Sequence, residues 1–335
     1  MDESSAYRRA GVDLDAASES LSAIEEAVTS TYDENVMAGL GAFGGLYALR
    51  DLPEGPILVA STDGVGTKTK VATATGRLDG LGEDLVNHCV NDILVQGARP
   101  LFFLDYIASS RLVPEQVAAV VASAARACRA AGVPLLGGET AEMPGVYEEG
   151  ELDLVGTIVG LVARDRLVDG ESVRPGDAIL ALASDGLHTN GFSLARAVLT
   201  GSFGERLGDS TVAEILLRPH RSYLAAVTPL LERPGLVKGM VHVTGGGLPG
   251  NLPRVLPSGQ GARIETGSWP VPEIFELIAS RGEVSQAEMH RVFNMGAGYL
   301  LIVDPDEVPA ARELCPETLY RIGEVTEGSG VVLAR

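Results

Sequence analysis

Short apolar runs alternate with amphipathic helical patterns along the first half of the chain, and several runs end in a loop rich in glycine or acidic residues. The runs typical of strands are 57–60, 101–104, 133–136 and 154–159, and helical patterns lie at 83–96 and 114–131. A glycine and then a proline follow each helical pattern, which is a helix-ending signal. Strands that alternate with helices predict an α/β fold whose binding residues gather in loops after strands.

A second series of such elements begins after a charged segment at 164–177, which contains turn-forming proline and glycine. The expected strands are 178–183, 241–243 and 299–303, and the expected helices are 191–199, 221–231, 272–281 and 308–314. A charged segment of this kind is typical of a linker between domains. At about 150 residues per domain, the chain of 335 residues predicts two α/β domains, placed at 1–168 and 169–335.

The charge balance narrows the classes of partner. The chain has 45 acidic and 26 basic residues, a formal net charge of -19. An acidic surface repels nucleic-acid phosphates and anionic membranes, so we expect a small-molecule partner, no nucleic acid and no membrane. Cys89, Cys128 and Cys315 are far apart and suggest neither a disulfide framework nor a zinc site. Because no export signal or membrane-length apolar stretch is visible, we expect a cytoplasmic protein.

The loop after the first predicted strand carries residue types that phosphate binding uses. It contains Asp63, Gly64, Gly66, Thr67 and Lys68, and two of the three lysines of the chain lie in it. Glycines let the backbone approach phosphates, an aspartate can hold a metal ion, and a lysine supplies a point charge. The spacing is not that of a Walker A loop. A solvated turn is the alternative interpretation.

Four carboxylates stand in apolar or glycine-rich surroundings. Alternation along the strand at 101–107 turns Asp105 toward the core. Asp92 lies at the edge of an apolar helical stripe, and Glu139 and Glu142 lie in a glycine-flanked segment. Inward carboxylates that converge on Mg²⁺ would explain all four. The alternatives are helix caps or buried pairs with arginine.

Three further segments are rich in glycine or polar groups. His188 and Asn190, in the loop 184–191, have groups able to hold a phosphate or an amide, although a lone loop histidine is also commonly structural. The glycines of 243–251 form a backbone nest suited to an anion. The run 39–45 is also glycine-rich. Two of these segments match G-x-G-x-x-G, but neither has the context of a dinucleotide-binding fold.

Taken together and in chain order, these loops resemble those of the phosphoribosylformylglycinamidine cyclo-ligases, also called aminoimidazole ribonucleotide synthetases. The resemblance runs nearly end to end. It rests on Thr62-Asp-Gly-Val-Gly-Thr-Lys68, Asp92-x4-Gly97-Ala98-Arg99-Pro100, Phe102-Phe-Leu-Asp105-Tyr106, Gly137-Gly-Glu-Thr-Ala-Glu-Met-Pro-Gly145, His188-Thr-Asn190-Gly191 and Thr244-Gly-Gly-Gly247. Each motif is moderately specific, and the ordered set is strongly specific.

The resemblance implies an α/β fold of the α+β type. An N-terminal ferredoxin-like sheet domain would pair into a barrel in a homodimer, beside a C-terminal α/β domain. The implied reaction is ATP-dependent ring closure of formylglycinamidine ribonucleotide to aminoimidazole ribonucleotide in purine biosynthesis, with release of ADP and phosphate. ATP and Mg²⁺ are the implied cofactors, and a need for K⁺ is left open.

The resemblance also assigns roles to residues. Those expected to be catalytic are Asp63, Lys68, Asp92, His188 and Asn190. Those expected to bind the cofactor are Gly44, Gly64, Gly66, Thr67, Asp105, Glu139, Glu142, Gly245, Gly246 and Gly247, and the expected metal ligands are Asp63, Asp92, Asp105 and Glu139. Lys68 is expected on a phosphate. The loops of His188 and of the last three glycines are expected at the ribonucleotide phosphate or at the amide that is activated.

Two other classes of function remain as alternatives. Selenophosphate synthetase, thiamine-phosphate kinase and the hydrogenase-maturation dehydratase share the scaffold. The first would carry a cysteine or selenocysteine near a lysine at its N-terminus, and residues 1–56 contain neither. A non-catalytic nucleotide-binding module is the second class, which an ATPase assay would separate. The segment with Glu25 and 32–34 is acidic where relatives are often basic, which argues against a phosphate contact there.

Overall fold

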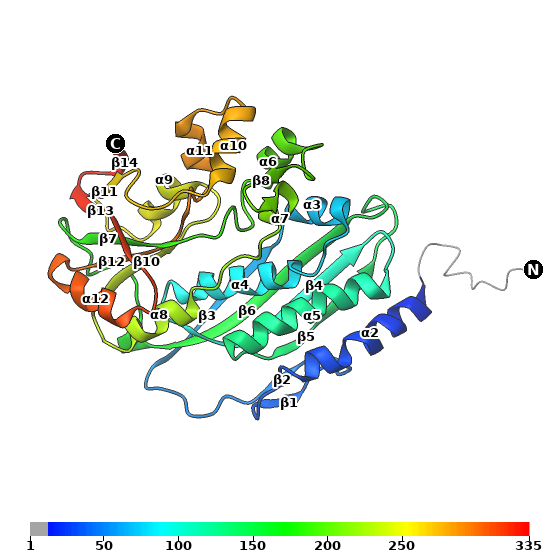
Figure 1. Ribbon diagram of the computed structural model, residues 1–335. Helices are drawn as coiled ribbons and strands as arrows, with labels where there is room; N and C mark the ends of the chain where they lie inside the picture. Colours follow the sequence, from blue (N-terminus) through cyan, green and yellow to red (C-terminus); the bar gives the residue numbers. More distant parts are fainter. Residues whose placement is uncertain (1–12, 335) are drawn as a thin grey trace, which may run out of the picture. The chain divides into compact units, whose positions relative to one another are not determined.

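The computed structural model describes residues 13–334, which fall into two compact units (Figure 1). The first unit contains the chain up to Val90 together with Arg99–Leu161, and the second contains Asn91–Ala98 and the chain from Val162 onward. The boundary proposed after residue 168 falls inside the second unit. Across the described residues, no helix is long and apolar enough to cross a membrane.

The first unit is built on a four-stranded sheet. Its strands, in spatial order, are β3 (Pro56–Gly64), β6 (Leu152–Ala163), β4 (Arg99–Ser109) and β5 (Leu135–Glu142). β4 runs antiparallel to β6 and parallel to β5. Adjacent parallel strands need a crossover connection, which α5 (Pro114–Ala131) provides. The connection from β3 to β4 contains α3 (Lys68–Thr75) and α4 (Leu81–Leu94).

A helix and a pair of short strands precede this sheet. The helix α2 (Leu14–Thr29) packs along α5, as Figure 1 shows. Asp13 caps α2, since its carboxylate accepts hydrogen bonds from the first backbone N–H groups of the helix. The short strands β1 (Val36–Ala38) and β2 (Leu46–Tyr47) form an antiparallel pair.

The connectivity of the first unit is β-α-β-α-β-β, with the last strand inserted between β3 and β4. The class of fold is the one predicted, whereas a ferredoxin-like unit has the connectivity β-α-β-β-α-β. The difference lies in the segment 143–151, where Pro144, Gly145 and Gly150 disfavour a helix between β5 and β6. Both helical connections therefore come before the final pair of strands.

The two faces of this sheet differ. In β3, Val59 is buried, while its neighbours Leu58 and Ala60 are exposed. The helix α4 lies on the buried face, because a side chain at Gly156 of β6 would collide there with Leu85. The opposite face carries Leu58, which is 59% exposed in the single chain. Successive residues of a strand point to opposite faces, which produces this contrast.

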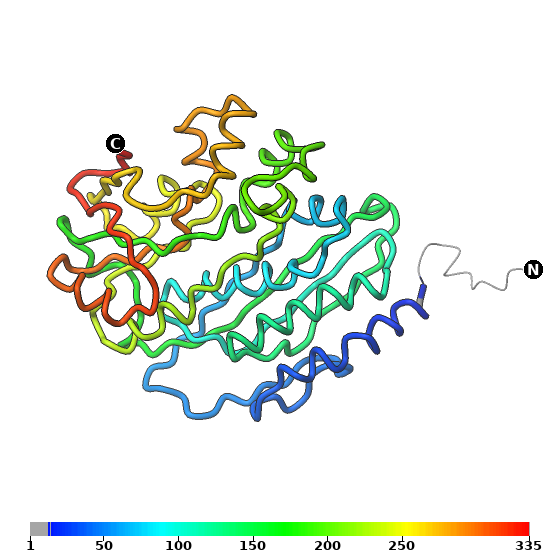
Figure 2. Tube along the Cα trace, viewed as in Figure 1, coloured from blue at the N-terminus to red at the C-terminus, as the bar shows by residue number. Residues whose placement is uncertain are grey.

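The second unit contains a six-stranded sheet. Its strands, in spatial order, are β10 (Val237–His242), β12 (Ala297–Val303), β7 (Ala178–Ala183), β13 (Tyr320–Glu327), β11 (Gln260–Glu265) and β14 (Gly330–Ala334). Figure 2 follows the red C-terminal end of the chain into β14, which pairs in parallel with β11. The other neighbouring strands are antiparallel.

Both faces of the six-stranded sheet are buried at β7 and β12. In β7, Leu180 belongs to the apolar cluster beneath α8 (Leu224–Leu231) and α12 (Val308–Leu314), and Ile179 belongs to the cluster on the other face. A strand buried on both faces appears in sequence as a continuous apolar run. This explains why β7 was predicted with its observed bounds.

The remaining elements of the second unit are short. The helices are α6 (Phe192–Leu199), α7 (Val212–Leu216), α9 (Gly247–Asn251), α10 (Glu273–Arg281) and α11 (Gln286–Val292). Two-residue strands β8 (Arg206–Leu207) and β9 (Ser210–Thr211) pair with each other. Single 3-10 turns lie at Arg164–Arg166, Leu252–Arg254 and Pro305–Glu307.

Candidate functional site

In the first unit, the loop between β3 and α3 runs from the end of a strand to the start of a helix. Asp63 and Gly64 end β3, and Thr67 stands immediately before α3. Gly66 has a φ of 62°, in the left-handed region that favours glycine. The first N–H groups of a helix have no partners within the helix and attract anions. This stretch therefore remains the candidate phosphate-binding loop of the unit.

Lys68 does not extend into solvent from this loop. Its Nζ lies 2.7 Å from Oδ1 of Asp84 in α4, and both side chains are 0% exposed. Burial lowers the pKa of Lys68, and the Asp84 carboxylate offsets part of that shift. The arrangement differs from the expected phosphate contact, because the ammonium group is held between two helices of the unit. A buried ammonium group needs a carboxylate partner, which is the physical reason for the difference.

Two ionic contacts at this loop were not predicted from the sequence. Oδ2 of Asp63 lies 3.2 Å from Nε2 of the buried His88, and the Asp63 side chain is 41% exposed. Lys70, which is 39% exposed, forms an ion pair with Glu151. His88 follows Asp84 by one helical turn, and this spacing in α4 is the signal that would have indicated it.

Asp105 lies on the helix-covered face of the sheet, as alternation predicted. A Cβ built on Gly138 of β5 would lie 1.8 Å from the Asp105 carboxylate, so only glycine fits beside it. Burial raises the pKa of Asp105 to about 7. It also raises the pKa of the Cys128 thiol in α5, and the Asp105 charge adds to that shift. Burial of Asp105 therefore favours the protonated, uncharged form of its carboxyl group.

Glu139 points away from Asp105. The register pairs Asp105 with Gly138 and Tyr106 with Glu139, so Glu139 shares the face of Tyr106. Adjacent residues of a strand point to opposite faces, and Glu139 is exposed on the open face of the sheet. Within the described part of the chain, no group of three ligand atoms suited to one metal ion includes Asp63, Asp105 or Glu139. Asp105 and Glu139 thus point to opposite faces of the sheet, whereas the sequence analysis placed both around one ion.

Glu142 and Gly44, both predicted to bind the cofactor, lie at the end of β5 and in the loop between β1 and β2. Both carboxylate oxygens of Glu142 accept backbone hydrogen bonds, from Leu112 at 2.9 Å and from Asp13 at 2.5 Å. Glu142 therefore anchors two chain segments at the end of β5. Gly44 lies exposed in the loop between β1 and β2, with no atom within 4 Å of a Cβ at that position.

In the second unit, a chain of contacts joins Asp92 to the loop after β7. Oδ1 of Asp92 lies 2.8 Å from Nδ1 of His242, and Nε2 of His242 lies 2.9 Å from Nε2 of His220. Nδ1 of His220 lies 3.2 Å from Oγ1 of Thr189. His188 stacks on His220 with ring centroids 4.1 Å apart. Asp92 and His188, both predicted, are thus connected by His220 and His242, which were not.

The loop that carries His188 is held by a neighbouring segment. Asn294 accepts a hydrogen bond from Oγ of Ser184 at 2.9 Å and donates one to the Gly186 carbonyl at 2.9 Å. His188 has a φ of 61°, an uncommon conformation for a residue with a side chain. Such conformations persist where the surrounding contacts determine them, and they are frequent at functional sites.

The glycine loop after β10 lies beside Asn190. A Cβ on Gly245 would lie 3.3 Å from Oδ1 of Asn190. A Cβ on Gly247 would lie 2.0 Å from the His290 carbonyl, and Asn251 donates a hydrogen bond to the Gly247 carbonyl at 2.9 Å. Among the described residues, Nδ2 of Asn190 is a buried donor with no hydrogen-bond partner. An unpaired buried donor of this kind suits a ligand that supplies the acceptor.

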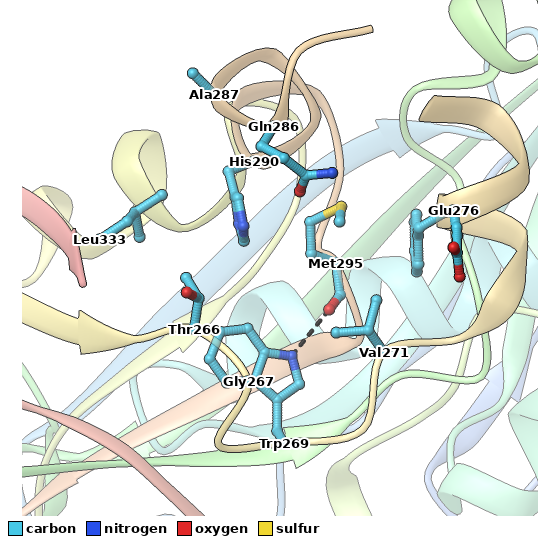
Figure 3. Close-up of a pocket in the computed structure, with 11 residues that line it drawn as sticks. Thr266, Gly267, Trp269, Val271, Glu276, Gln286, Ala287, His290, Met295 and Leu333 are labelled. Atoms are coloured by element: carbon cyan, nitrogen blue, oxygen red, sulfur yellow. Dashed lines mark hydrogen bonds between the residues drawn. The ribbon is translucent and has the colours of Figure 1, made fainter. Parts of the chain in front are cut away.

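The second unit also has a pocket of about 530 Å³ (Figure 3). Trp269, whose Nε1 donates to the Met295 carbonyl at 2.9 Å, forms one wall, and Val271 and His290 project into it. Burial lowers the pKa of His290. The residues that line this pocket include none of the predicted site residues.

Two consecutive α/β units that carry these loops define a two-domain protein of the AIR synthase type, and family models agree. The model of the N-terminal domain of AIR synthase related proteins matches residues 44–162, and that of the C-terminal domain matches residues 174–334. A phosphoribosylformylglycinamidine cyclo-ligase from Desulfitobacterium hafniense is 49% identical over 329 residues, 96% of each chain. One from Geobacillus kaustophilus is 46% identical over 339 residues, 98% of each chain. The chain therefore belongs to the phosphoribosylformylglycinamidine cyclo-ligase family, and the resemblance found in its sequence is confirmed.

Solved structures support the fold alone. The structure of HypE from E. coli has a TM-score of 0.70 at 21% identity and covers 95% of this chain and 94% of its own. A hydrogenase maturation protein HypE in complex with ATP has a TM-score of 0.65 at 23% identity, covering 97% of this chain and 88% of its own. The scaffold is thus shared by proteins of different activity.

Proposed function

We propose that this chain is an ATP-dependent cyclo-ligase that closes formylglycinamidine ribonucleotide to aminoimidazole ribonucleotide. The observation that carries this conclusion is the identity of 46% to 50% with cyclo-ligases over at least 91% of the chain. In the reaction, the formyl amide oxygen attacks the γ-phosphorus of ATP and ADP leaves. The amidine nitrogen then attacks the activated carbon, and phosphate departs with the former amide oxygen as that nitrogen loses a proton.

The loop from Asp63 to Thr67 is the proposed site of the ATP phosphates. Gly64 and Gly66 allow close approach of the backbone, and the loop leads into the N-terminus of α3, an end of a helix that favours an anion. A structural relative solved in complex with ATP supports the choice of nucleotide. Phosphoryl transfer requires mainly positioning and neutralisation of charge, so backbone donors and a metal ion are chemically sufficient.

Asp63 is the proposed ligand of Mg²⁺ in the first unit. Its exposed carboxylate fits a hard cation, and His88 orients it from the buried side. Mg²⁺ usually binds one or two carboxylates together with nucleotide phosphates, so the separation of Asp105 from Glu139 does not conflict with a metal. When bound, Mg²⁺ would neutralise charge on the phosphates. Asp92 was predicted as a further Mg²⁺ ligand. One of its carboxylate oxygens, Oδ1, contacts Nδ1 of His242.

His188, Asn190 and the glycine loop at 245–247 are proposed to hold the ribonucleotide phosphate or the reacting amide. Asn190 offers a buried donor, and the adjacent glycine backbone is braced by Asn251. Holding the amidine against the activated carbon could supply an effective molarity of roughly 10⁵ M or more. No covalent intermediate with the protein is then required.

A homodimer is proposed from the open face of the four-stranded sheet. Leu58 is 59% exposed there in the single chain. Exposed apolar surface on a sheet is typical of an interface between subunits. Pairing of two such faces would form the barrel that the family resemblance implies.

The test is an assay of the purified protein with formylglycinamidine ribonucleotide, ATP and Mg²⁺. ADP and aminoimidazole ribonucleotide are followed in the same sample, with the ribonucleotide omitted as control. Equal formation of both products, dependent on the ribonucleotide, is the expected result. ADP formation without the imidazole would assign the chain to another ATP-dependent activity on this scaffold, and no ADP in any sample would indicate a module that only binds nucleotides.

A further inference from the structure

Three of the five histidines of the chain meet inside the second unit. They come from distant parts of the sequence: His188 from the loop after β7, His220 from the segment before α8, and His242 from the end of β10. Their side chains belong to residues that are 3%, 1% and 5% exposed. One ring nitrogen from each lies within 4.8 Å of the other two. We refer to these three residues as the histidine cluster.

Two members of the cluster are oriented by partners on their outer nitrogens. Nδ1 of His242 contacts Asp92 at 2.8 Å, and Nδ1 of His220 contacts Thr189 at 3.2 Å. Both rings consequently direct Nε2 to the same point, where the two atoms are 2.9 Å apart. Metal-binding histidines commonly have this arrangement, in which a carboxylate or another polar group holds one ring nitrogen and fixes the other toward the ion.

We propose that the histidine cluster binds a divalent transition-metal ion, for which Zn²⁺ is the probe. Imidazole nitrogen suits Zn²⁺, Ni²⁺ and Cu²⁺, whereas Mg²⁺ prefers oxygen ligands, so this site is separate in its chemistry from the metal of the nucleotide. Zn²⁺ binds nitrogen at about 2.0–2.1 Å in tetrahedral geometry, which puts two ligand nitrogens about 3.3 Å apart. The spacing of 2.9 Å between the two Nε2 atoms therefore needs to widen only slightly.

His188 completes the site by a change of ring orientation. Its ring now stacks on His220 with an interplanar angle of 24°. Parallel rings cannot direct their in-plane lone pairs at one ion, so His188 turns out of the stack as it binds. Gly298 lies under this ring, since a Cβ there would be 2.7 Å from Cε1 of His188. Because Gly298 has no side chain, the His188 ring can lie against β12.

The competing interpretation is a chain of hydrogen bonds without a metal. In that case Thr189 donates to His220, His220 donates from Nε2 to His242, and His242 donates to Asp92. A proton then occupies the position between the two Nε2 atoms that a metal ion would take. The metal-site interpretation predicts that an added metal ion displaces this proton and binds. The hydrogen-bond interpretation predicts that the proton stays and that no metal ion binds.

The consequence for activity rests on the proposed function. If His188 contacts the ribonucleotide or the reacting amide, occupation of the cluster removes it from that role, and Zn²⁺ inhibits the enzyme. Binding itself does not depend on the reaction, so it is measured without substrate. Failure of the proposed function would leave the binding result unchanged, and the two proposals can be judged separately.

The experiment titrates the full chain, freed of metal with a chelator that is then removed, with Co²⁺ and then with Zn²⁺. Tetrahedral Co²⁺ gives visible absorption bands, and Zn²⁺ should displace it. We expect a single ion per chain, and His220→Gln, which keeps a side chain of similar size, should weaken binding at least about tenfold. The control is His290→Gln, a buried histidine of the same unit outside the cluster, which should bind as the unaltered chain does.

A second measurement uses the unaltered chain and is independent of how the variants fold. With ¹⁵N-labelled histidine, one equivalent of Zn²⁺ should move the ring nitrogen signals of the three cluster residues and leave that of His290 in place. Absence of Co²⁺ bands at a large molar excess, unmoved cluster signals, or equal loss of affinity in the two glutamine variants would each overturn the proposal.

Discussion

Nζ of Lys68 lies 2.7 Å from the Asp84 carboxylate, and neither side chain is exposed to solvent. The pair connects the start of α3 to the first turn of α4, directly behind the candidate phosphate loop. Lys68 therefore contributes to the position of the loop through its buried partner. Removal of either charge would break this ion pair while the remaining group stays buried.

We expect Asp84→Asn to lower the free energy of unfolding by about 3–5 kcal/mol, because it removes the carboxylate that forms an ion pair with the buried Lys68 ammonium. The measurement is urea denaturation of the variant and the unaltered chain. Lys70→Ala is the control, since this lysine is 39% exposed and its ion pair with Glu151 should contribute only about 0–1 kcal/mol. Equal effects of the two substitutions would contradict the importance of the buried pair.

Gly138→Ala should destabilise the first unit, because the new Cβ would lie 1.8 Å from a carboxylate oxygen of Asp105 and 2.5 Å from its backbone oxygen. Overpacking of this kind costs about 1–3 kcal/mol or more. Gly137→Ala is a matched control, since its nearest neighbour, Leu104, is 3.9 Å away. Thermal unfolding of both variants tests the prediction, and similar unfolding temperatures for the two would refute it.

The raised pKa of Asp105 predicts a specific dependence of stability on pH. The pKa of this group is near its ordinary value of 3.8 in the unfolded chain, and burial raises it to about 7 in the folded protein. Between these values the folded state holds a proton that the unfolded state has lost, so stability is full below about pH 4 and falls as pH rises to about 7. Asp105→Asn should flatten this part of the profile.

The profile can be measured by urea denaturation at several pH values between 4 and 8. Glu139→Gln on the open face of the same sheet provides the comparison, because that carboxylate is exposed. If the stability of Asp105→Asn fell with pH as steeply as that of the unaltered chain, burial of the Asp105 carboxyl group would not be the cause of the pH dependence.

Asp63→Asn should raise the Mg²⁺ concentration needed for half-maximal activity, because an amide is a weaker ligand for a hard cation than a carboxylate. The measurement is the cyclo-ligase assay at saturating ATP over a series of Mg²⁺ concentrations. Glu115→Gln, an exposed carboxylate on α5, is the control for a simple change of charge. An unchanged Mg²⁺ dependence in the Asp63 variant would remove it from the proposed ligand set.

Asn190→Ala and Asn294→Ala should have different effects. Nδ2 of Asn190 has no hydrogen-bond partner among the described residues, so its loss should reduce kcat/KM about 10-fold to 100-fold with little change in stability. Asn294 makes two hydrogen bonds to the loop and a third to Gly296 of its own segment, so its loss should lower stability as well. Parallel kinetic and unfolding measurements distinguish the two, and a stability loss for Asn190→Ala would indicate a structural residue.

The helices and buried strands were predictable because their apolar patterns are strong. The observed bounds of α5, β7 and α12 match the predicted 114–131, 178–183 and 308–314. The strands β11, β13 and β14 were missed because their residues are largely polar or half-buried, and β14 lies at the edge of the sheet. An edge strand has a neighbour on one side only, so its sequence is less constrained.

The candidate site was predictable as a set of loops but not as a set of contacts. The strand-to-helix position of Asp63 follows from the local sequence. The burial of Lys68 depends on Asp84, and the orientation of Asp92 depends on His242, which lies 150 residues away. Glu139 was grouped with Asp105 because both are acidic, and only the register of β4 with β5 places them on opposite faces. Single-sequence patterns contain periodicity, but register and long-range pairing arise from the folded sheet.

The boundary between the two units runs through α4 and is crossed by the chain three times, before Asn91, after Ala98 and after Leu161. During synthesis, the residues 91–98 leave the ribosome long before most of the second unit exists. Asn91, which is 0% exposed in the finished protein, contacts Arg221 and Tyr223, and Arg221 lies 130 residues further along the chain. The contacts that bury Asn91 can therefore form only after residues 221–223 have been translated.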